Sequence, residues 1–316
     1  MAKPRVSVII LNYNGESKLG SLLDDCITSA LNQTYENIEV LFVDNGSTDN
    51  SCGYVKAKYG NKLRVICLDH NYGFALGNNL ASKFVSQDSE YLLFPNPDAI
   101  LEPDYVKVIV NFMERNRGVG VVQGVQAFMY SSLVSLGGYV DSYGRSVELI
   151  VKSFVPKLPI MVLWVSGSAM VIRRRLFEEL KGFSPELFLY HDEIDLCSRV
   201  WLKGYIVVSI PFTKYEHLRG GVVGKTSWIS WYFANRNRWL TTIRCMPLKN
   251  LILSLLLALP LEFTVNIVKS LKRAERLRAP LYTKILRFLI KEFHSNIRKR
   301  SLYRSRGYLT KFIHRC

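Results

Sequence analysis

Several patterns that mark familiar protein classes are missing from the sequence. None of the six cysteines forms a Cys-x-x-Cys pair or a zinc-finger spacing, so we expect reduced, buried thiols in a cytosolic protein. No Gly-x-Gly-x-x-Gly follows the first predicted strand at residues 6–11, which disfavours a dinucleotide-dependent dehydrogenase. The apolar part of the N-terminus is too short for a signal peptide, so we expect no secretion.

Long apolar runs and acidic residues are both scarce in the C-terminal quarter. The charge-free run at residues 250–261 has 12 residues, fewer than the ~20 that a spanning helix needs, so we expect it not to cross a membrane by itself. Residues 244–316 contain 17 Lys and Arg against three acids, whereas residues 1–243 contain 25 against 23. This asymmetry predicts a domain at 1–243 followed by a basic tail at 244–316. It indicates an anionic partner, either a membrane or a nucleic acid.

Apolar strands alternate with amphipathic helices in the first part of the chain. The predicted strands are 6–11, 38–43, 63–68, 91–94 and 119–123, and the predicted helices are 17–31, 50–59, 74–86 and 103–115. Continuous apolar strands in such an alternation are typical of an α/β fold with a mostly parallel sheet and helices on both faces.

Four polar loops follow predicted strands, at residues 12–15, 44–49, 69–73 and 96–98. Ligands of parallel sheets bind beyond the carboxyl ends of the strands, so these loops are candidates for a binding site. Any one of them is equally well explained as an ordinary turn, because turns favour Asn, Asp, Gly and Ser.

The alternation weakens at residues 126–163, where glycines and Pro156 divide it into short pieces, and we interpret this part as a variable insertion. Regular elements then return. We expect strands at 164–172 and 205–210, helices at 174–180 and 190–202, a loop at 217–225 and an aromatic helix from Ser227.

Two groups of acidic residues are candidates for chemistry. Asp98 follows a strand and comes directly after Pro95-Asn96-Pro97, whose prolines restrict the backbone, so its carboxylate is a candidate ligand for Mg²⁺ or Mn²⁺. Asp192, Glu193 and Asp195 are crowded enough to raise a pKa toward the range of a general base. The structural alternatives are a capped helix start at Asp98 and stabilising charge at a helix N-terminus for the others.

A glycine-rich segment at 219–226 is similar to a phosphate-binding P-loop. Arg219 stands where the first glycine of that motif is required, which disfavours a true P-loop. The segment could still contact a diphosphate through His217, Arg219 and Lys225.

Taken in order, these motifs resemble those of family 2 glycosyltransferases, in the branch that includes rhamnosyltransferases. The resemblance covers roughly residues 5–240 and is carried by the segments 6–15, 43–49, 71–79, 96–99, 167–169 with 173–174, and 192–199. It implies a GT-A fold with a Rossmann-like sheet and an inverting transfer of a sugar from a nucleotide-diphosphate sugar. A divalent cation, Mg²⁺ or Mn²⁺, is the implied cofactor.

The resemblance also implies roles for individual residues. Glu193 stands at the position of the general base, with Asp192 as the alternative. Asp98 and His217 stand at the metal position, and Asp98 is the only carboxylate in a motif that usually has two. The implied nucleotide-sugar contacts are Asn12, Tyr13, Asn14, Asp44, Ser47, Asn71, Gly73, Asn78, Asn96, Gly167, Ser168 and Lys225.

The tail predicts where such an enzyme would act. Tyr282, Ile285, Leu289 and Phe293 share one face of a predicted helix whose other face is basic, a pattern typical of helices in a membrane interface. We therefore expect a peripheral enzyme on the cytoplasmic face of the cell membrane, acting on a lipid-linked or cell-envelope glycan, without nucleic acid.

Two alternatives remain open at this stage. One is a non-enzymatic, basic membrane- or nucleic-acid-binding protein on a transferase scaffold. The other is a nucleotidyltransferase related to sugar-nucleotide pyrophosphorylases, which the missing glycine-rich signature after the first strand disfavours.

Overall fold

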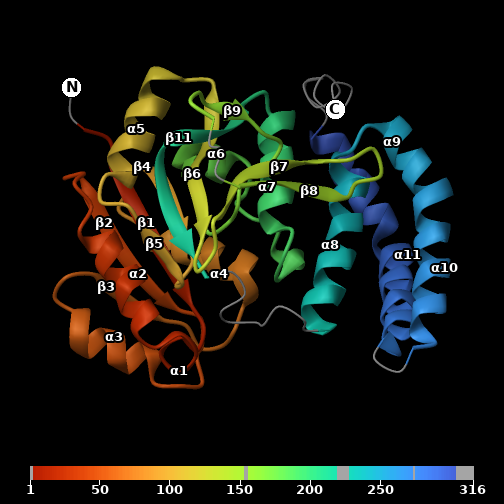
Figure 1. Cartoon of the computed structure of the whole chain (residues 1–316), viewed down its shortest axis with the longest axis horizontal. Helices are drawn as coiled ribbons and strands as arrows, with labels where there is room; N and C mark the ends of the chain where they lie inside the picture. Colours follow the sequence, from red (N-terminus) through yellow and green to blue (C-terminus); the bar gives the residue numbers. More distant parts are fainter. Residues whose placement is uncertain (1–2, 153–155, 219–227, 273–274, 304–316) are drawn as a thin grey trace.

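A central sheet with helices on both faces forms the first three quarters of the protein, and further helices stand beside it (Figure 1). The computed structural model describes residues 3–152, 156–218, 228–272 and 275–303. In these ranges the sheet has 11 strands, and its main path runs β3-β2-β1-β4-β10-β6-β11-β5. The strands are β1 (Arg5–Asn12), β2 (Ile38–Asp44), β3 (Arg64–Cys67), β4 (Ser89–Pro95), β5 (Ala99–Leu101), β6 (Val119–Phe128), β7 (Leu133–Val140), β8 (Ser146–Lys152), β9 (Ile160–Met161), β10 (Ala169–Arg173) and β11 (Ile206–His217).

The first half confirms the predicted alternation of strands and helices. β1, β2, β3 and β4 are parallel neighbours, and apolar clusters cover both faces of the sheet. The predicted helix at 17–31 is wrong in one respect, because Gly20, with a positive φ of 55°, divides it into two helices. The helices are α1 (Gly15–Leu19), α2 (Ser21–Leu31), α3 (Ser51–Tyr59), α4 (Gly73–Ala81), α5 (Tyr105–Arg115), α6 (Arg174–Glu179) and α7 (Asp192–Leu202), with short 3₁₀ turns η1 (Ser82–Phe84) and η2 (Pro185–Leu187).

Two antiparallel strands bring distant segments to the carboxyl ends of the parallel strands. β10 lies between β4 and β6 and runs antiparallel to both, with Ala169 opposite Pro95. The short strand β5 pairs with the end of β11, so that His217 lies opposite Ala99. These registers place the segments around Ser168 and His217 beside the loop that follows β4.

The segment 126–163 is more regular than expected. Instead of a loose insertion it contains the hairpin of β7 and β8, which extends β6, and the short strand β9, which pairs with β11. Gly137 permits this path because it has a positive φ of 83° and a side chain there would meet the carbonyl oxygen of Trp164.

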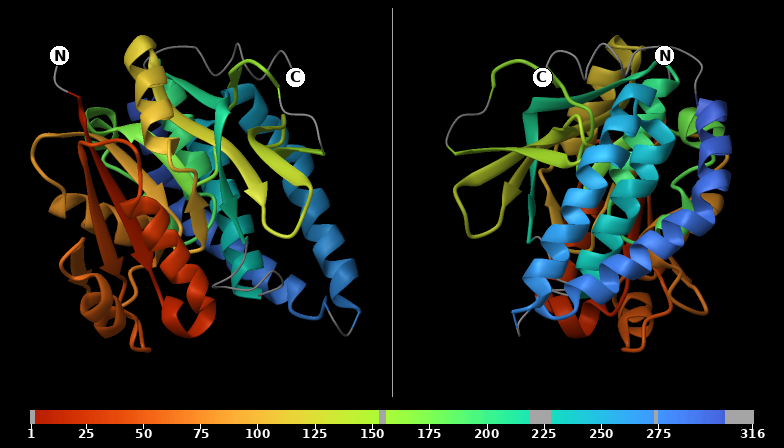
Figure 2. Two further views of the ribbon diagram at one scale, coloured as in Figure 1. Left: turned by 60° about the vertical axis from the view of Figure 1, so that its left-hand side comes forward. Right: turned by 90° about the vertical axis from the view of Figure 1, so that its right-hand side faces the viewer.

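The C-terminal helices gather on one side of the sheet (Figure 2). They are α8 (Trp228–Cys245), α9 (Leu248–Leu253), the π-helical turn η3 (Ser254–Ala258), α10 (Leu259–Ser270) and α11 (Arg278–Tyr303). The domain boundary predicted after residue 243 falls inside α8 and stays a prediction.

The face of α11 that was expected in a membrane interface is buried within the protein. Tyr282 and Ile285 are 0% exposed and Leu289 is 6% exposed, because they pack against Trp239 of α8 and its neighbours. Only Phe293, at 39%, is exposed among the four residues predicted to face lipid. The expectation is therefore wrong for Tyr282, Ile285 and Leu289, since an amphipathic helix can cover its apolar face with protein as well as with lipid.

The apolar run at 250–261 belongs to a longer element than expected. Leu248–Ser270 forms 23 continuous helical residues, and its most apolar window of 18 residues has a mean hydropathy of 2.1 and is 17% buried. It is the one helix in the described ranges that is long and apolar enough to cross a membrane, by length and composition only. The flanking helical turns supply the length that the charge-free run lacks.

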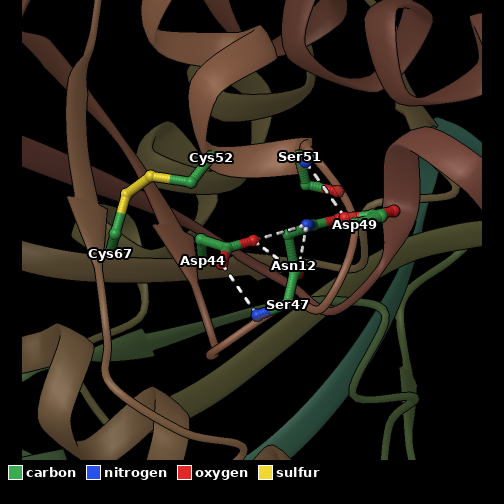
Figure 3. The surroundings of a disulfide bond; sticks show 7 residues. All are labelled: Asn12, Asp44, Ser47, Asp49, Ser51, Cys52 and Cys67. Atoms are coloured by element: carbon green, nitrogen blue, oxygen red, sulfur yellow. Dashed lines mark hydrogen bonds between the residues drawn. A yellow bond between two sulfur atoms is a disulfide. The ribbon is translucent and has the colours of Figure 1, made fainter.

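Two of the six cysteines are joined, contrary to the expectation of reduced thiols. A disulfide links Cys52, at the start of α3, to Cys67, at the end of β3 (Figure 3). Cys26, Cys197 and Cys245 are free and buried, as expected for small apolar side chains. The spacing of 15 residues between the bonded pair has no signature in the sequence.

Candidate active site

A cavity of about 390 Å³ opens at the carboxyl ends of β1 and β4. Residues from both antiparallel strand junctions and from the start of α7 line it. Eleven of the predicted site residues are among its lining: Asn12, Tyr13, Asn71, Gly73, Asn96, Asp98, Gly167, Ser168, Asp192, Glu193 and His217. The fold therefore brings together motifs that are spread over more than half of the chain.

The predicted nucleotide contacts Asn14, Asp44 and Ser47 are not among the residues that line the cavity, and they hold two loops together. Asp44 is 3% exposed, and its carboxylate accepts hydrogen bonds from the Asn12 amide at 2.9 Å and from the Ser47 hydroxyl at 2.6 Å (Figure 3). Ser47 in turn accepts the backbone N–H of Asn14 at 2.8 Å. These bonds fix the loop after β1 against the loop after β2.

Two further predicted contacts lie outside the cavity or the described residues. Asn78 is 1% exposed and donates to the carbonyl of Phe74 within α4, so it supports the helix and does not line the cavity. Lys225, Arg219 and the rest of the glycine-rich segment 219–226 lie outside the described residues.

Asn45 lines the cavity and was missed by the sequence analysis. Its amide nitrogen donates to Asn71 and to the carbonyl of Gly73, both at 3.1 Å, and its carbonyl accepts from the backbone of Tyr72. The signal available in the sequence was its place directly after Asp44, at the carboxyl end of a strand.

Asp98 and His217 form the candidate metal site. The pairing of β5 with β11 brings Oδ1 of Asp98 to 3.2 Å from Nε2 of His217, and the Gln126 amide nitrogen lies 2.8 Å from Nδ1 and fixes the ring. In the described ranges no group of three His, Cys, Asp or Glu side chains could hold a metal ion. One carboxylate and one imidazole suit Mn²⁺ or Mg²⁺ when phosphate oxygens and water complete the coordination.

Asp192 and Glu193 begin α7 and face the same cavity. Burial raises the pKa of Glu193 to about 7, a backbone hydrogen bond opposes the increase, and the negative charge of Glu148 adds to it. Burial and the charge of Glu193 hold the pKa of Asp192 well above its ordinary value. A carboxylate with a pKa near neutrality can accept a proton and release it again, as a general base requires.

Asp195 shows how neighbouring cations change the pKa of a buried carboxyl group. It lies less than one helical turn after Glu193 and is 0% exposed. Although burial raises its pKa, the guanidinium groups of Arg199 and Arg244 outweigh that effect and keep the pKa below its ordinary value. Asp195 is therefore a structural anion, whereas the two carboxylates before it stay available for chemistry.

Glu148, on β8, is a second residue that the sequence analysis missed. It lines the cavity and raises the pKa of Glu193 through its charge. It lies in the segment 126–163, where the weak pattern gave no reason to select one side chain.

Comparisons with known proteins agree with this arrangement. Residues 7–181 match the family described as Glycosyl transferase family 2. The chain belongs to glycosyl transferase family 2. Residues 96–302 also match Glycosyl transferase family group 2, and this matched range includes the C-terminal helices.

This glycosyltransferase is rhamnosyltransferase-like in sequence. It is 26% identical over 232 residues to rhamnosyltransferase WbbL of Escherichia coli, covering 65% of this chain and 80% of that protein. It is 21% identical to the N-acetylglucosaminyl-diphospho-decaprenol L-rhamnosyltransferase of Mycobacterium tuberculosis, covering 65% and 75%. It spans about a third (34%) of an uncharacterized glycosyltransferase of Haemophilus influenzae, to which it is 32% identical over 115 residues.

The fold of the glycosyltransferase is the predicted GT-A fold. The crystal structure of residues 1–349 of Staphylococcus aureus TarS with UDP-GlcNAc has a TM-score of 0.60 at 17% identity, covering 95% of this chain and 90% of that one. GalNAc-T7 with UDP, GalNAc and Mn²⁺ also has a TM-score of 0.60 at 15% identity, covering 76% and 48%.

We expect Glu148→Gln to shift the pH dependence of sugar transfer. Removing the negative charge beside Glu193 lowers the pKa of Glu193, so the acidic limb of the rate profile moves to lower pH. Rates measured from pH 5 to pH 9 test this, with Glu90→Gln as the control because Glu90 is exposed on β4 outside the cavity. An unchanged acidic limb in Glu148→Gln would contradict the assignment.

Proposed function

We propose that the protein is an inverting glycosyltransferase that moves a sugar from a nucleotide-diphosphate sugar to a hydroxyl of a lipid-linked or cell-envelope glycan. The observation that carries the proposal is one cavity that has the buried carboxylate of Asp192 and the half-buried carboxylate of Glu193 on one wall, neither in an ion pair within the described residues, and the Asp98–His217 pair on another. The first arrangement suits proton removal from an acceptor, and the second suits a diphosphate with its cation.

The mechanism follows from these two walls. The donor diphosphate lies toward Asp98 and His217, with the nucleoside toward the loops after β1 and β2. Glu193 takes the proton of the acceptor hydroxyl as its oxygen attacks the anomeric carbon on the side opposite the diphosphate. The bond from that carbon to the diphosphate oxygen breaks, and the configuration inverts. When bound at Asp98 and His217, Mg²⁺ or Mn²⁺ supplies positive charge to the departing diphosphate.

Asp192 takes a supporting part in this proposal. It is 1% exposed, and its Oδ1 has no hydrogen-bond partner among the described residues. Because its pKa lies well above the ordinary value, Asp192 keeps its proton to higher pH than a solvent-exposed carboxyl group does. A protonated Asp192 leaves the single negative charge of the pair on Glu193, so one residue acts as the base.

The proposed acceptor is argued from a relative, and the proposed location at the membrane is argued from exposed apolar side chains. The relative from M. tuberculosis is named for a diphospho-decaprenol substrate, and we propose a lipid-linked acceptor of similar kind here. Such an acceptor favours a cytoplasmic enzyme held at the membrane. We place the proposed membrane contact on Leu256, Leu257 and Leu261, whose side chains are 69%, 54% and 65% exposed, and not on the buried face of α11.

Glu193→Gln should abolish transfer and leave donor binding nearly unchanged, because it removes the proton acceptor and keeps the shape. Loss of a general base costs ~10²- to 10⁴-fold in rate. Single-turnover transfer and calorimetric binding of nucleotide-diphosphate sugars measure the two effects. If Asp192→Asn is inactive and Glu193→Gln stays active, Asp192 is the base instead of Glu193. If the wild type binds no donor, the non-enzymatic alternative is favoured.

Asp98→Ala should remove most of the metal dependence of donor binding, because Asp98 is the carboxylate of the candidate metal site. Asp44→Ala should weaken donor binding equally with and without metal, because Asp44 holds the loops. Donor affinities measured with Mn²⁺ and with a chelator test both. If Asp98→Ala keeps the dependence of the wild type, the ion is held elsewhere.

The membrane proposal is tested by flotation with vesicles that contain anionic lipid. We expect the wild type to float, and salt to loosen the association only in part, because charge is screened whereas apolar insertion is not. Replacing Leu256, Leu257 and Leu261 by Gln keeps helix propensity and should remove the salt-resistant part. Leu158→Gln is the control, since Leu158 is 73% exposed outside the C-terminal helices.

Two results would change the membrane proposal. A triple variant that floats like the wild type at high salt would reject the contact through α10 and η3. Wild-type protein that resists extraction at alkaline pH would indicate that Leu248–Ser270 crosses the membrane instead of lying on it.

A further inference from the structure

The chain reaches the catalytic carboxylates through an unusual turn. Phe188, Tyr190 and His191 have positive φ angles of 62°, 66° and 67°, and only Leu189 separates the first from the other two. Bulky side chains rarely adopt this left-handed conformation, and no glycine in the turn makes it easy. Contacts from outside the turn must therefore hold it.

One side chain on α8 supplies most of these contacts. Asn237 is 0% exposed, and its Nδ2 donates to the carbonyl oxygens of Leu187 at 2.8 Å, Leu189 at 2.8 Å and Tyr190 at 2.7 Å. Three carbonyls point at one amide because the left-handed residues turn the backbone inward. Few side chains other than Asn offer two donors on so short a stem.

The neighbouring residue completes the contact from the same helix. Arg236 donates from Nε to Oδ1 of Asn237 at 2.8 Å, which fixes the orientation of the amide. Its guanidinium also donates to the carbonyls of Glu186 at 2.6 Å and Leu187 at 3.0 Å. Two adjacent residues of α8 thus hold the backbone of the segment 186–190.

The turn that they hold forms one wall of the active-site cavity. Phe188, Leu189 and Tyr190 line the cavity beside Asp192 and Glu193. The carbonyl of Phe188 also accepts the backbone N–H of Phe74 at 2.6 Å, across the cavity wall. The path of the turn therefore decides where α7 begins and where its first two carboxylates point.

We propose that Asn237 is a positioning residue for sugar transfer, and that it keeps the buried Asp192 and the half-buried Glu193 at the place in the cavity wall where Glu193 acts as the base. The inference rests on the proposed function, because it assigns Asn237 a part in the same reaction. It also gives the C-terminal helices a role in catalysis besides membrane contact.

The test compares Asn237→Ala and Asn237→Ser with Asn235→Ala. Asn235 lies on the same helix, and its Nδ2 donates to the carbonyl of Trp231 within that helix. We expect Asn237→Ala to lower kcat by ~10- to 100-fold, as for a displaced general base, and to leave the donor Kd within about twofold. Asn237→Ser keeps one donor and should lie between Asn237→Ala and the wild type.

The pH profile separates positioning from a merely structural role. A loosened turn admits water to Glu193, so the acidic limb of the rate profile should move to lower pH in Asn237→Ala. Loss of folded protein alone would lower the active fraction and the melting temperature without moving that limb. Rates are therefore normalised to folded protein, and if Asn237→Ala does not fold, Asn237→Ser carries the test.

The outcomes distinguish this inference from the function on which it rests. Wild-type protein that transfers no sugar from any donor would reject the proposed function. Active wild-type protein beside a folded Asn237 variant with unchanged kcat and pH profile would reject only the positioning role. An equal loss of activity in Asn235→Ala would also reject it, because that result would point to the helix as a whole.

Discussion

The proposed active site depends on a buried carboxylate, Asp192, and a half-buried one, Glu193, on which the effect of burial outweighs that of any neighbouring positive charge. An unpaired charge is costly to bury, so such groups hold their protons to higher pH than usual. Asp195 follows on the same helix and has Arg199 and Arg244 beside it, and its pKa moves in the opposite direction. The chemical difference within one helix start therefore comes from the placement of two arginines, not from the residue types.

The protein must hold these carboxylates in place against their tendency to reach water. Arg244 of α8 contacts Asp195 on α7 and also pairs with Glu186, just before the left-handed turn. Asn296 of α11 accepts from Arg244 in turn. Buried ion pairs stabilise a fold weakly on balance, but removing one partner leaves an uncompensated charge and is strongly destabilising. This network makes the position of α7 depend on the C-terminal helices.

The sequence predicted the parts of this arrangement that are local. The parallel strands were recognisable from continuous β-branched runs, and the binding loops from their place after those strands. The partners of Asn237 are backbone carbonyls some 50 residues away, which no side-chain pattern encodes. The apolar face of α11 was visible, but Tyr282 and its neighbours are covered by protein and not by lipid. A hydrophobic pattern shows that a face is covered without showing by what.

The two halves of the cavity are held by different parts of the chain. On the donor side, the Cys52–Cys67 disulfide lies near Asp44 (Figure 3). The backbone carbonyl of Asp44 accepts the backbone N–H of Leu68 at 2.8 Å. All of these contacts lie within the first 80 residues. The catalytic side is held by α8 and α11, through contacts that cross 50 residues or more. The loops proposed to hold the nucleoside and the helix start that carries the proposed base thus have largely different supports, and the hydrogen bond between the backbones of Phe74 and Phe188 joins them.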